Sequence, residues 1–243
     1  MAESLDDLIG TMASLIGESE LKTNSIEVLK EKSARGDLGA TLRLGKIYKE
    51  KHNYTEALKY YAILANQGNT DAMYEAGMAA MSARYNQAKS RKERFHYQQE
   101  AIHFLTMAAK NERVDAEFQL GMIYISNEYI SEKLFSGNKN DKKGVEYLLS
   151  AAQKSYPLAQ YYLAQAYGEG IGVKRSIEDE IFWLRCAQIN GNGKAADQLN
   201  RLAHSNAAGA LRNMLKAIDQ KIAGHQEYIK VYHISKTIGL VLN

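Results

Sequence analysis

Apolar residues recur along the chain with the three-and-four spacing of helical faces, and they fall into blocks that repeat. The first block has a small residue, then Leu or Ala four positions later, then Gly or Ala, and usually Tyr. Its copies are Ala40, Leu44, Gly45 and Tyr48; Ala72, Ala76, Gly77 and Ala80; Ala116, Leu120, Gly121 and Tyr124; and Ala159, Leu163, Ala164 and Tyr167. A fading copy consists of Ala195, Leu199 and Asn200.

Each copy is followed by a second block, in which an aromatic residue precedes small and apolar residues. Its copies are Ala57, Tyr60, Tyr61, Leu64 and Ala65; Ala101, Phe104, Leu105, Ala108 and Ala109; Gly144, Tyr147, Leu148, Ala151 and Ala152; and Glu180, Trp183, Leu184, Ala187 and Gln188. Small residues let two helices approach closely, and the aromatic residues are expected to fill the space between successive pairs. A single pair cannot bury its apolar face, so the pairs must stack. The pattern predicts an all-α protein, a right-handed α-solenoid (superhelix) of helix-turn-helix repeats.

These positions resemble the Sel-1-like repeat, a relative of the tetratricopeptide repeat. The clearest copy spans residues 159–191, where Trp183 falls at the family's tryptophan position and the loop after Tyr167 carries Gly168, Gly170 and Gly172. The resemblance covers roughly residues 37–203. The second and third copies carry insertions, within residues 82–97 and 126–143, which either lengthen the helices or project as loops.

Three regions are predicted. Residues 1–36 form N-terminal capping helices or a degenerate repeat, residues 37–203 hold four to five repeats, and residues 204–243 form a closing helix and a tail. The apolar stripes that predict the end helices are Leu5, Leu8, Ile9, Met12, Leu15 and Ile16, then Ile26 and Leu29, and finally Leu211, Met214, Leu215 and Ile218. Residues 226–242 are predicted to form a packed terminal helix.

Composition agrees with a folded, helical, cytoplasmic protein. The chain has 45% apolar and 24% charged residues and a single Pro, against a usual proportion of about 5%. Its net charge of +3 does not by itself indicate nucleic acid. One cysteine fits a reducing compartment, residues 1–20 do not resemble a signal peptide, and no apolar run is long enough to cross a bilayer.

A concave groove lined by the first helices is the expected binding surface, because repeat proteins commonly bind there. The resemblance to tetratricopeptide repeats places its exposed positions three residues before, one after and four after the repeat glycine. These positions hold Leu42, Lys46 and Lys49; Tyr74, Met78 and Met81; Phe118, Met122 and Ile125; and Tyr161, Gln165 and Gly168. Methionines and aromatic residues suit an amphipathic helix or an extended peptide. The alternative is that tight curvature buries these side chains.

Two other segments have a functional and a structural interpretation. The basic run from Lys89 to Arg94, followed by Phe95, His96 and Tyr97, could bind single-stranded nucleic acid, but its spacing is more typical of a solvated helix face. The glycines of residues 168–172 could suggest a phosphate loop. That loop lacks the Gly-Lys-Ser/Thr ending and is explained by the repeat turn.

Catalytic and metal chemistry have little support in the sequence. The six histidines form no His-x-x-x-His pair and none adjoins a cysteine, so no metal set is predicted. Cys186 lies one turn from Trp183 within a predicted helix and is expected to be a small core residue. We therefore expect no cofactor, no small-molecule substrate and no enzymatic activity.

The sequence favours a protein–protein interaction module, an adaptor, scaffold or regulator that binds a polypeptide segment in its groove. The resemblance implies that bacterial members are often linked to secretion or virulence. One alternative is an inhibitor or immunity-type protein that blocks an enzyme. Others are an RNA-binding protein and a cell-wall-directed hydrolase of the cysteine-rich repeat type, against which the single cysteine argues.

Overall fold

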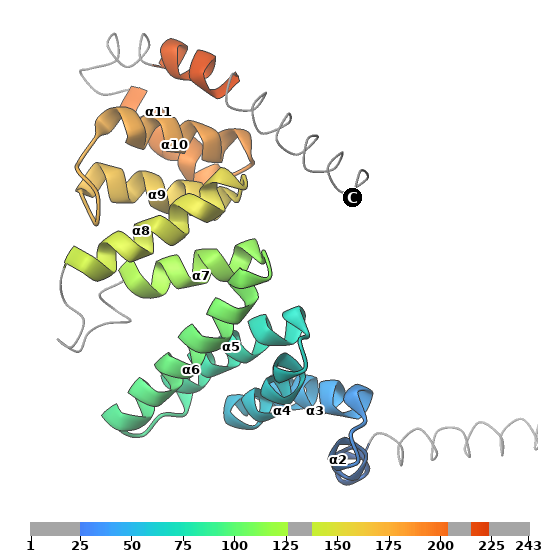
Figure 1. Ribbon diagram of the computed structural model, residues 1–243. Coiled ribbons are helices and arrows are strands. Elements are labelled where there is room, and N and C mark those ends of the chain that lie inside the picture. Colours follow the sequence, from blue (N-terminus) through green and yellow to red (C-terminus); the bar gives the residue numbers. More distant parts are fainter. Residues whose placement is uncertain (1–24, 126–137, 204–214, 224–243) are drawn as a thin grey trace, which may run out of the picture. The chain divides into compact units, whose positions relative to one another are not determined.

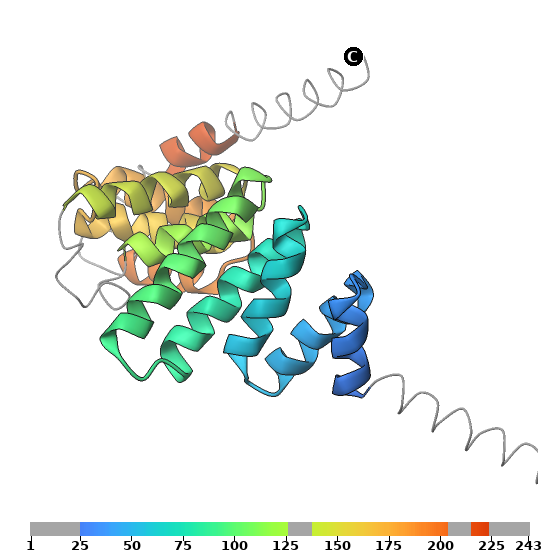
Figure 2. The ribbon, with the colours of Figure 1, turned by 60° about the horizontal axis from the view of Figure 1, so that its bottom comes forward.

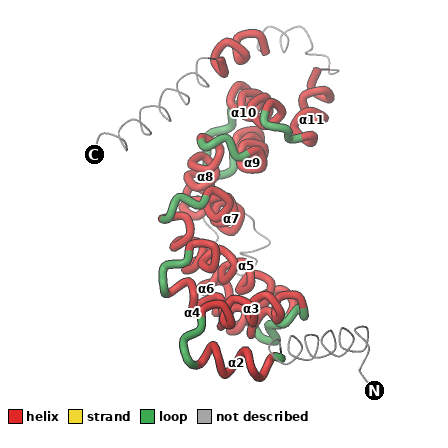
Figure 3. The backbone as a smooth tube through the Cα atoms, turned by 90° about the vertical axis from the view of Figure 1, so that its right-hand side faces the viewer, coloured by secondary structure: helices red, strands yellow, loops and turns green. Residues whose placement is uncertain are grey.

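The computed structural model describes residues 25–125, 138–203 and 215–223. These residues form helices joined by turns, with no strand among them (Figure 3). The predicted all-α, helix-turn-helix class is therefore confirmed. The chain divides into two compact units, Met1–Arg113 and Val114–Asn243, which we call unit 1 and unit 2.

Unit 1 is a stack of helices in which each helix packs on the next one along the chain (Figure 2). The helices are α2 (Ile26–Ala34), α3 (Leu38–Glu50), α4 (Tyr54–Asn66), α5 (Thr70–Asn86) and α6 (Arg91–Lys110). Short turns join them, so successive helices run antiparallel. The predicted helix around Ile26 and Leu29 is confirmed as α2, with Leu29 buried against α3.

Unit 2 repeats this arrangement (Figure 1). Its helices are α7 (Val114–Ile125), α8 (Asn138–Gln153), α9 (Pro157–Glu169), α10 (Ile177–Ile189) and α11 (Gly193–Ala203). Residues 215–223 form a further helical segment, whose Ile218 and Ile222 are buried in the core of unit 2. The closing helix predicted there is confirmed for Leu215 and Ile218, whereas Leu211 and Met214 lie outside the described residues.

The repeat positions lie at equal depths, as the sequence predicts. Ala40, Ala72, Ala116 and Ala159 are at most 4% exposed, and Leu44, Ala76, Leu120 and Leu163 are fully buried. In the second helices, Leu64, Leu105, Leu148 and Leu184 are likewise at most 3% exposed, although Leu64 lies one turn further along its helix than the others. Each first helix therefore buries its small residues against its partner.

The repeat glycine is the point of closest approach within a pair. A Cβ atom added to Gly45 would lie 2.9 Å from the Tyr61 ring, one added to Gly77 would lie 2.6 Å from Leu105 Cγ, and one added to Gly121 would lie 2.7 Å from Leu148 Cδ2. Real Cβ atoms do not approach other atoms so closely, so any side chain here would push the two helices apart. The large residue facing this position is always buried in the partner helix.

Two of the aromatic residues act differently from the prediction. Tyr60 and Tyr147 were expected to fill the space between successive pairs. Instead, each stacks within its own pair: Tyr60 on Tyr48 with ring centroids 5.6 Å apart, and Tyr147 on Tyr124 at 5.9 Å. Both rings are only partly buried.

The turn between pairs has one backbone conformation throughout. Four positions before each repeat alanine, the chain takes a left-handed conformation at Gly36, Gly68, Glu112, Ser155 and Gly191, with φ between 62° and 91°. The amide that follows donates back to a carbonyl in the preceding helix, as Asn69 N does to Leu64 O at 3.2 Å. This is the Schellman arrangement, and it ends the second helix while aiming the chain into the next pair. Asp37, Asn69 and Asn192 then cap the following helix.

The insertion within residues 82–97 lengthens both helices of its pair: α5 continues to Asn86 and α6 starts at Arg91. The other insertion falls largely in residues 126–137, outside the described residues. The predicted stripe from Leu5 to Ile16 and the predicted terminal helix of residues 226–242 also lie outside them.

The glycine contact gives a stability prediction. Gly121→Ala should cost about 1–3 kcal/mol, because the new methyl group would overlap Leu148 and the carbonyl oxygen of Gly144. The matched control is Gly193→Ala, where no atom lies within 4 Å and the variant should be as stable as the parent or slightly more stable. Urea unfolding measures both, and equal midpoints for the two variants would contradict the close approach.

The left-handed turns give a second prediction. Ser155→Gly should raise the free energy of unfolding by about 0.5–1 kcal/mol, because glycine adopts φ of 62° without steric strain. Gly68→Ala should lower it by about 1–2 kcal/mol for the converse reason, although nothing lies near its added methyl group. Thermal unfolding of the two variants should thus shift in opposite directions; shifts of the same sign would show that these turns are not equivalent.

Candidate functional site

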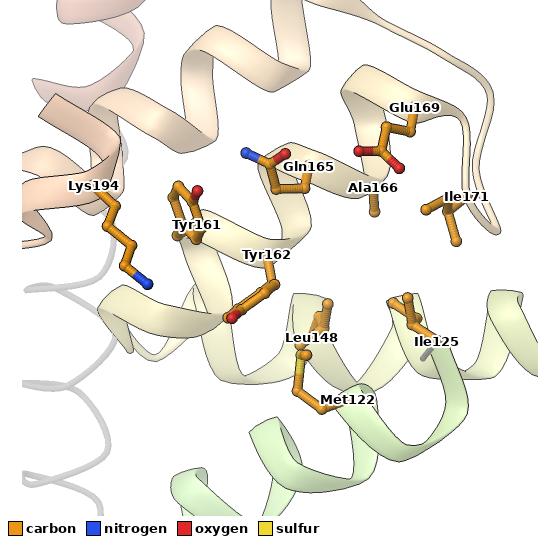
Figure 4. Close-up of a pocket in the computed structure, with 10 residues that line it drawn as sticks. All are labelled: Met122, Ile125, Leu148, Tyr161, Tyr162, Gln165, Ala166, Glu169, Ile171 and Lys194. Atoms are coloured by element: carbon orange, nitrogen blue, oxygen red, sulfur yellow. The ribbon is translucent and has the colours of Figure 1, made fainter. Parts of the chain in front are cut away.

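Unit 2 contains an open pocket of about 450 Å³, formed by the first helices of two successive pairs and by residues that follow them (Figure 4). Its lining comes from α7, α8, α9, the loop after α9 and the start of α11. The lining residues are Met122, Ile125, Leu148, Tyr161, Tyr162, Gln165, Ala166, Glu169, Ile171 and Lys194. The volume lies in the usual range for ligand sites, about 300–1,000 Å³.

The floor of the pocket is apolar. Leu148 and Ala166 are buried, while Met122, Ile125 and Ile171 are partly buried and expose part of their side chains to the pocket. Because the repeat glycine Gly121 draws α7 onto α8, Met122 and Leu148 form one continuous surface beneath α9. The floor can therefore accept an apolar side chain from outside the unit.

Two adjacent tyrosines form one wall. The rings of Tyr161 and Tyr162 meet edge to face, with centroids 5.4 Å apart. Tyr162 also packs on Phe118, at 5.8 Å, and Phe118 packs on Tyr156, at 5.3 Å. This aromatic cluster fixes the wall, which suits contact with an apolar or aromatic group.

A chain of side-chain hydrogen bonds orients Gln165, which lies one turn after Tyr161 on α9. Its Nε2 donates to Gln198 Oε1 at 2.6 Å, and Gln198 Nε2 donates in turn to Glu180 Oε1 at 3.1 Å. Because the amide nitrogen of Gln165 is used in this way, its carbonyl oxygen is the group available to accept a hydrogen bond in the pocket. Gln165 should therefore recognise a donor.

Glu180 anchors that chain from a half-buried position. Burial raises the pKa of its carboxyl group, and the hydrogen bond from Gln198 partly offsets this effect. The carboxyl group packs against the α-carbon of Gly168, where an added Cβ atom would lie 2.8 Å from Glu180 Cδ. The other copies of the repeat have Ala57, Ala101 and Gly144 at this position, so a carboxylate here is particular to the fourth pair.

Four of the predicted groove residues meet in this pocket: Met122, Ile125, Tyr161 and Gln165. Gly168, which was expected to join them, instead packs against Glu180. Phe118 is only 7% exposed, and its aromatic contacts place it in the core of unit 2. The expectation that Phe118 lines an open groove is therefore wrong.

The remaining predicted groove residues belong to unit 1. Leu42, Lys46 and Lys49 are exposed, and Lys49 Nζ lies 2.5 Å from a Glu75 carboxylate oxygen. Tyr74 and Met78 are partly buried; the Arg113 guanidinium covers the Tyr74 ring at 4.5 Å.

Met81 is only 6% exposed, so the expectation that it lines the groove is also wrong. It lies on α5, which packs against both α4 and α6 and is buried on most of its circumference.

The model of the Sel1 repeat matches residues 37–69, 98–112, 114–156 and 157–187, which make up half of the chain. The chain belongs to the Sel1 repeat family. The last of these matches covers one helix pair: it begins at the first residue of α9 and ends within α10.

Two solved Sel1 repeat structures share this fold. The chain is similar to a Sel1 repeat protein from Oxalobacter formigenes, with 21% identity, a TM-score of 0.52, and coverage of 79% of this chain and 75% of that one. It is also similar to c5321, described as a protective antigen present in uropathogenic Escherichia coli strains, with 21% identity and a TM-score of 0.50. That likeness covers 85% of this chain and 46% of c5321.

A curated relative is DAP3-binding cell death enhancer 1 of Rattus norvegicus, 25% identical over 111 residues. The match covers 46% of this chain and a fifth of the length of that relative. At these identities the comparisons establish the repeat fold alone.

Several residues that line the pocket of unit 2 could not be predicted as site residues from the Sel1 repeat positions. Glu169 and Ile171 lie at and just after the end of α9, in the loop that was interpreted only as a turn. Lys194 belongs to the fading last copy, and Tyr162 occupies a position that holds the polar residues Arg43, Glu75 and Gln119 in the other copies. The sequence does contain a signal for Lys194. The fading copy predicts a further first helix, α11, after the fourth pair, and Lys194 lies at the start of that helix.

Other residues considered from the sequence have structural roles in the Sel1 repeats. Cys186 is 6% exposed, as predicted, and burial raises the pKa of its thiol to about 12. The run from Lys89 to Arg94 includes the start of α6, where the Glu93 amide donates to Ser90 Oγ and the Lys89 amide donates to the Glu93 carboxylate. The Tyr97 hydroxyl bonds to Thr55.

In the described ranges, no three His, Cys, Asp or Glu side chains are placed to hold a metal ion. Among the described helices, none is long and apolar enough to cross a membrane.

The half-buried carboxyl group gives a pH prediction. Because the pKa of Glu180 is raised in the folded state, its ionised form lowers stability at neutral pH, and this cost disappears as pH falls through that pKa. Glu180→Gln should therefore melt slightly higher than the parent at pH 7 and lose its advantage near pH 4.5 and below. Glu146→Gln, which changes an exposed carboxylate on α8, is the control. A lower melting temperature for Glu180→Gln at pH 7 would contradict this assignment.

Proposed function

We propose that this chain is a non-catalytic interaction module that binds a segment of another polypeptide in the pocket of unit 2. The observation that carries the proposal is the convergence of Met122, Ile125, Tyr161 and Gln165 on one apolar-floored cavity. Sel1 repeats are typical of protein–protein interaction modules, which agrees with this proposal.

The chemistry of the lining suits a side chain of a polypeptide better than a polar metabolite. Methionine and isoleucine on the floor offer adaptable apolar contact, while the tyrosines can pack on an apolar group and still donate hydrogen bonds at their edges. Gln165 adds an acceptor for a backbone or side-chain donor. Among the ten lining residues, no nucleophile is hydrogen-bonded to a base, which is the arrangement that covalent catalysis needs.

The effect of binding on the partner's activity distinguishes the two kinds of interaction module that the sequence leaves open. An adaptor or scaffold would hold its partner without changing the partner's activity, whereas an inhibitor or immunity-type protein would abolish it. We propose the adaptor role, because the pocket takes a side chain or short segment and covers no large surface. The buried thiol of Cys186 suits a reducing compartment, so we place the interaction in the cytoplasm.

The test is quantitative capture of partner proteins from the source cell with the parent chain and with Met122→Gln. This change keeps side-chain length and helix propensity but introduces an amide that a bound apolar group would leave without hydrogen bonds. We expect the affinity for the captured partner to fall at least tenfold, about 1.4 kcal/mol, by calorimetry, with little change in melting temperature.

Ile177→Gln is the matched control, because Ile177 is the most exposed large apolar residue among the described residues of unit 2 and lies outside the pocket. It should bind the same partner as tightly as the parent. Equal binding by the parent and Met122→Gln would contradict the proposed function.

A further inference from the structure

The two charged residues of the pocket lie on opposite sides of its apolar floor. Figure 4 shows Lys194 beside Tyr161 at one side, and Glu169 beside Ile171 at the other. Both residues are exposed. Within the described part of the chain, neither the Lys194 ammonium nor the Glu169 carboxylate forms an ion pair, whereas Lys154, Arg185 and Lys221 of the same unit do.

The backbone strengthens this separation of charge. Glu169 is the last residue of α9, where the helix dipole is negative, and Lys194 is the second residue of α11, where it is positive. No basic residue lies in the last turn of α9, and no acidic residue lies in the first turn of α11. Side chain and helix end therefore have the same sign on each side of the pocket.

Such placement is unfavourable for the free protein. A charge at the helix end of the same sign costs about 0.3–1 kcal/mol at an exposed site, and the opposite choice would have stabilised both helices. An occupant that brings an anion to Lys194 and a cation to Glu169 would relieve both repulsions. The same charges would disfavour an occupant in the reverse direction, which gives the pocket a polarity as well as a shape.

Gln165 adds to the preference on the Glu169 side. It lies one turn before Glu169 on α9, and its amide nitrogen donates to Gln198, so its oxygen is left to accept a hydrogen bond. An acceptor and a carboxylate together favour a group that donates hydrogen bonds and carries positive charge, such as a guanidinium or an ammonium.

We infer that the occupant is a partner polypeptide segment with one large apolar side chain, flanked by an acidic residue that meets Lys194 and by a basic residue that meets Glu169 and Gln165. This inference rests on the proposed function and adds to it the chemistry and the direction of the bound segment. The pocket volume suits one or two large side chains, so the apolar anchor is short and the two flanking charges supply the specificity.

The experiment is selection of a phage-displayed library of random peptides on the full chain, with removal of peptides that also bind Met122→Gln. The selected peptides should carry an apolar anchor with an acidic residue on one side and a basic residue on the other. Their affinities are then measured against the parent, Lys194→Glu, Glu169→Lys and the double charge reversal.

Each single reversal should weaken binding at least tenfold, and the double reversal should bind a synthetic peptide in which the two flanking charges are exchanged. The control pair is Lys216→Glu with Glu146→Lys, which alters the same charges at exposed positions outside the pocket and should leave affinity unchanged. Measuring the affinities at two salt concentrations should show a larger salt effect for the parent than for the reversals.

The outcomes separate the two proposals. Peptides that need Met122 but bind equally in either charge order would overturn the inferred polarity and leave the proposed function standing. A library that yields no Met122-dependent peptide would overturn both. Self-association of the chain that Met122→Gln abolishes, without any selected peptide, would show that a second copy is the occupant and would also overturn the inference.

Discussion

The structure depends on the close contact between the repeat glycine and the large residue that faces it in the partner helix. Gly45, Gly77 and Gly121 leave no room for a side chain, because Tyr61, Leu105 and Leu148 of the partner helices pack directly on the backbone there. The residue before the glycine is buried by this contact, whereas the residue after it reaches the surface of the pair: Lys46 is exposed, and Met78 and Met122 are partly buried. Met122 follows Gly121 directly, and its place on the pocket floor is a consequence of that approach.

The burial of the repeat positions could be predicted from the sequence, because small residues at a fixed helical spacing usually lie where two helices make close contact. The groove could be predicted only in part, since exposure depends on what each first helix packs against. Met81 is buried because α5 packs against both α4 and α6, and Phe118 is buried because Tyr156 and Tyr162 close over it. Neither neighbour can be recognised from the spacing within one repeat.

Polar residues at buried positions were also beyond the sequence analysis. Gln160 is 3% exposed and links two helices, donating to Ala152 O at 3.0 Å and accepting from Asn190 Nδ2 at 2.9 Å. Glu117 is 7% exposed and accepts hydrogen bonds from Ser150 and Lys154. Such residues form hydrogen bonds across helices, although Glu117 Oε2 is buried without a partner, so their burial follows from tertiary contacts that local periodicity does not encode. The chain from Glu180 to Gln165 is a third case, and it shapes the pocket.

The central claim is that α9 and the helices around it form the binding surface of unit 2. Hydrogen–deuterium exchange of the full chain, with and without its captured partner, tests this directly. The account predicts that binding slows exchange in Pro157–Glu169 and at the start of Gly193–Ala203, with α10 unchanged. Slowed exchange confined to unit 1, or to α10, would contradict it.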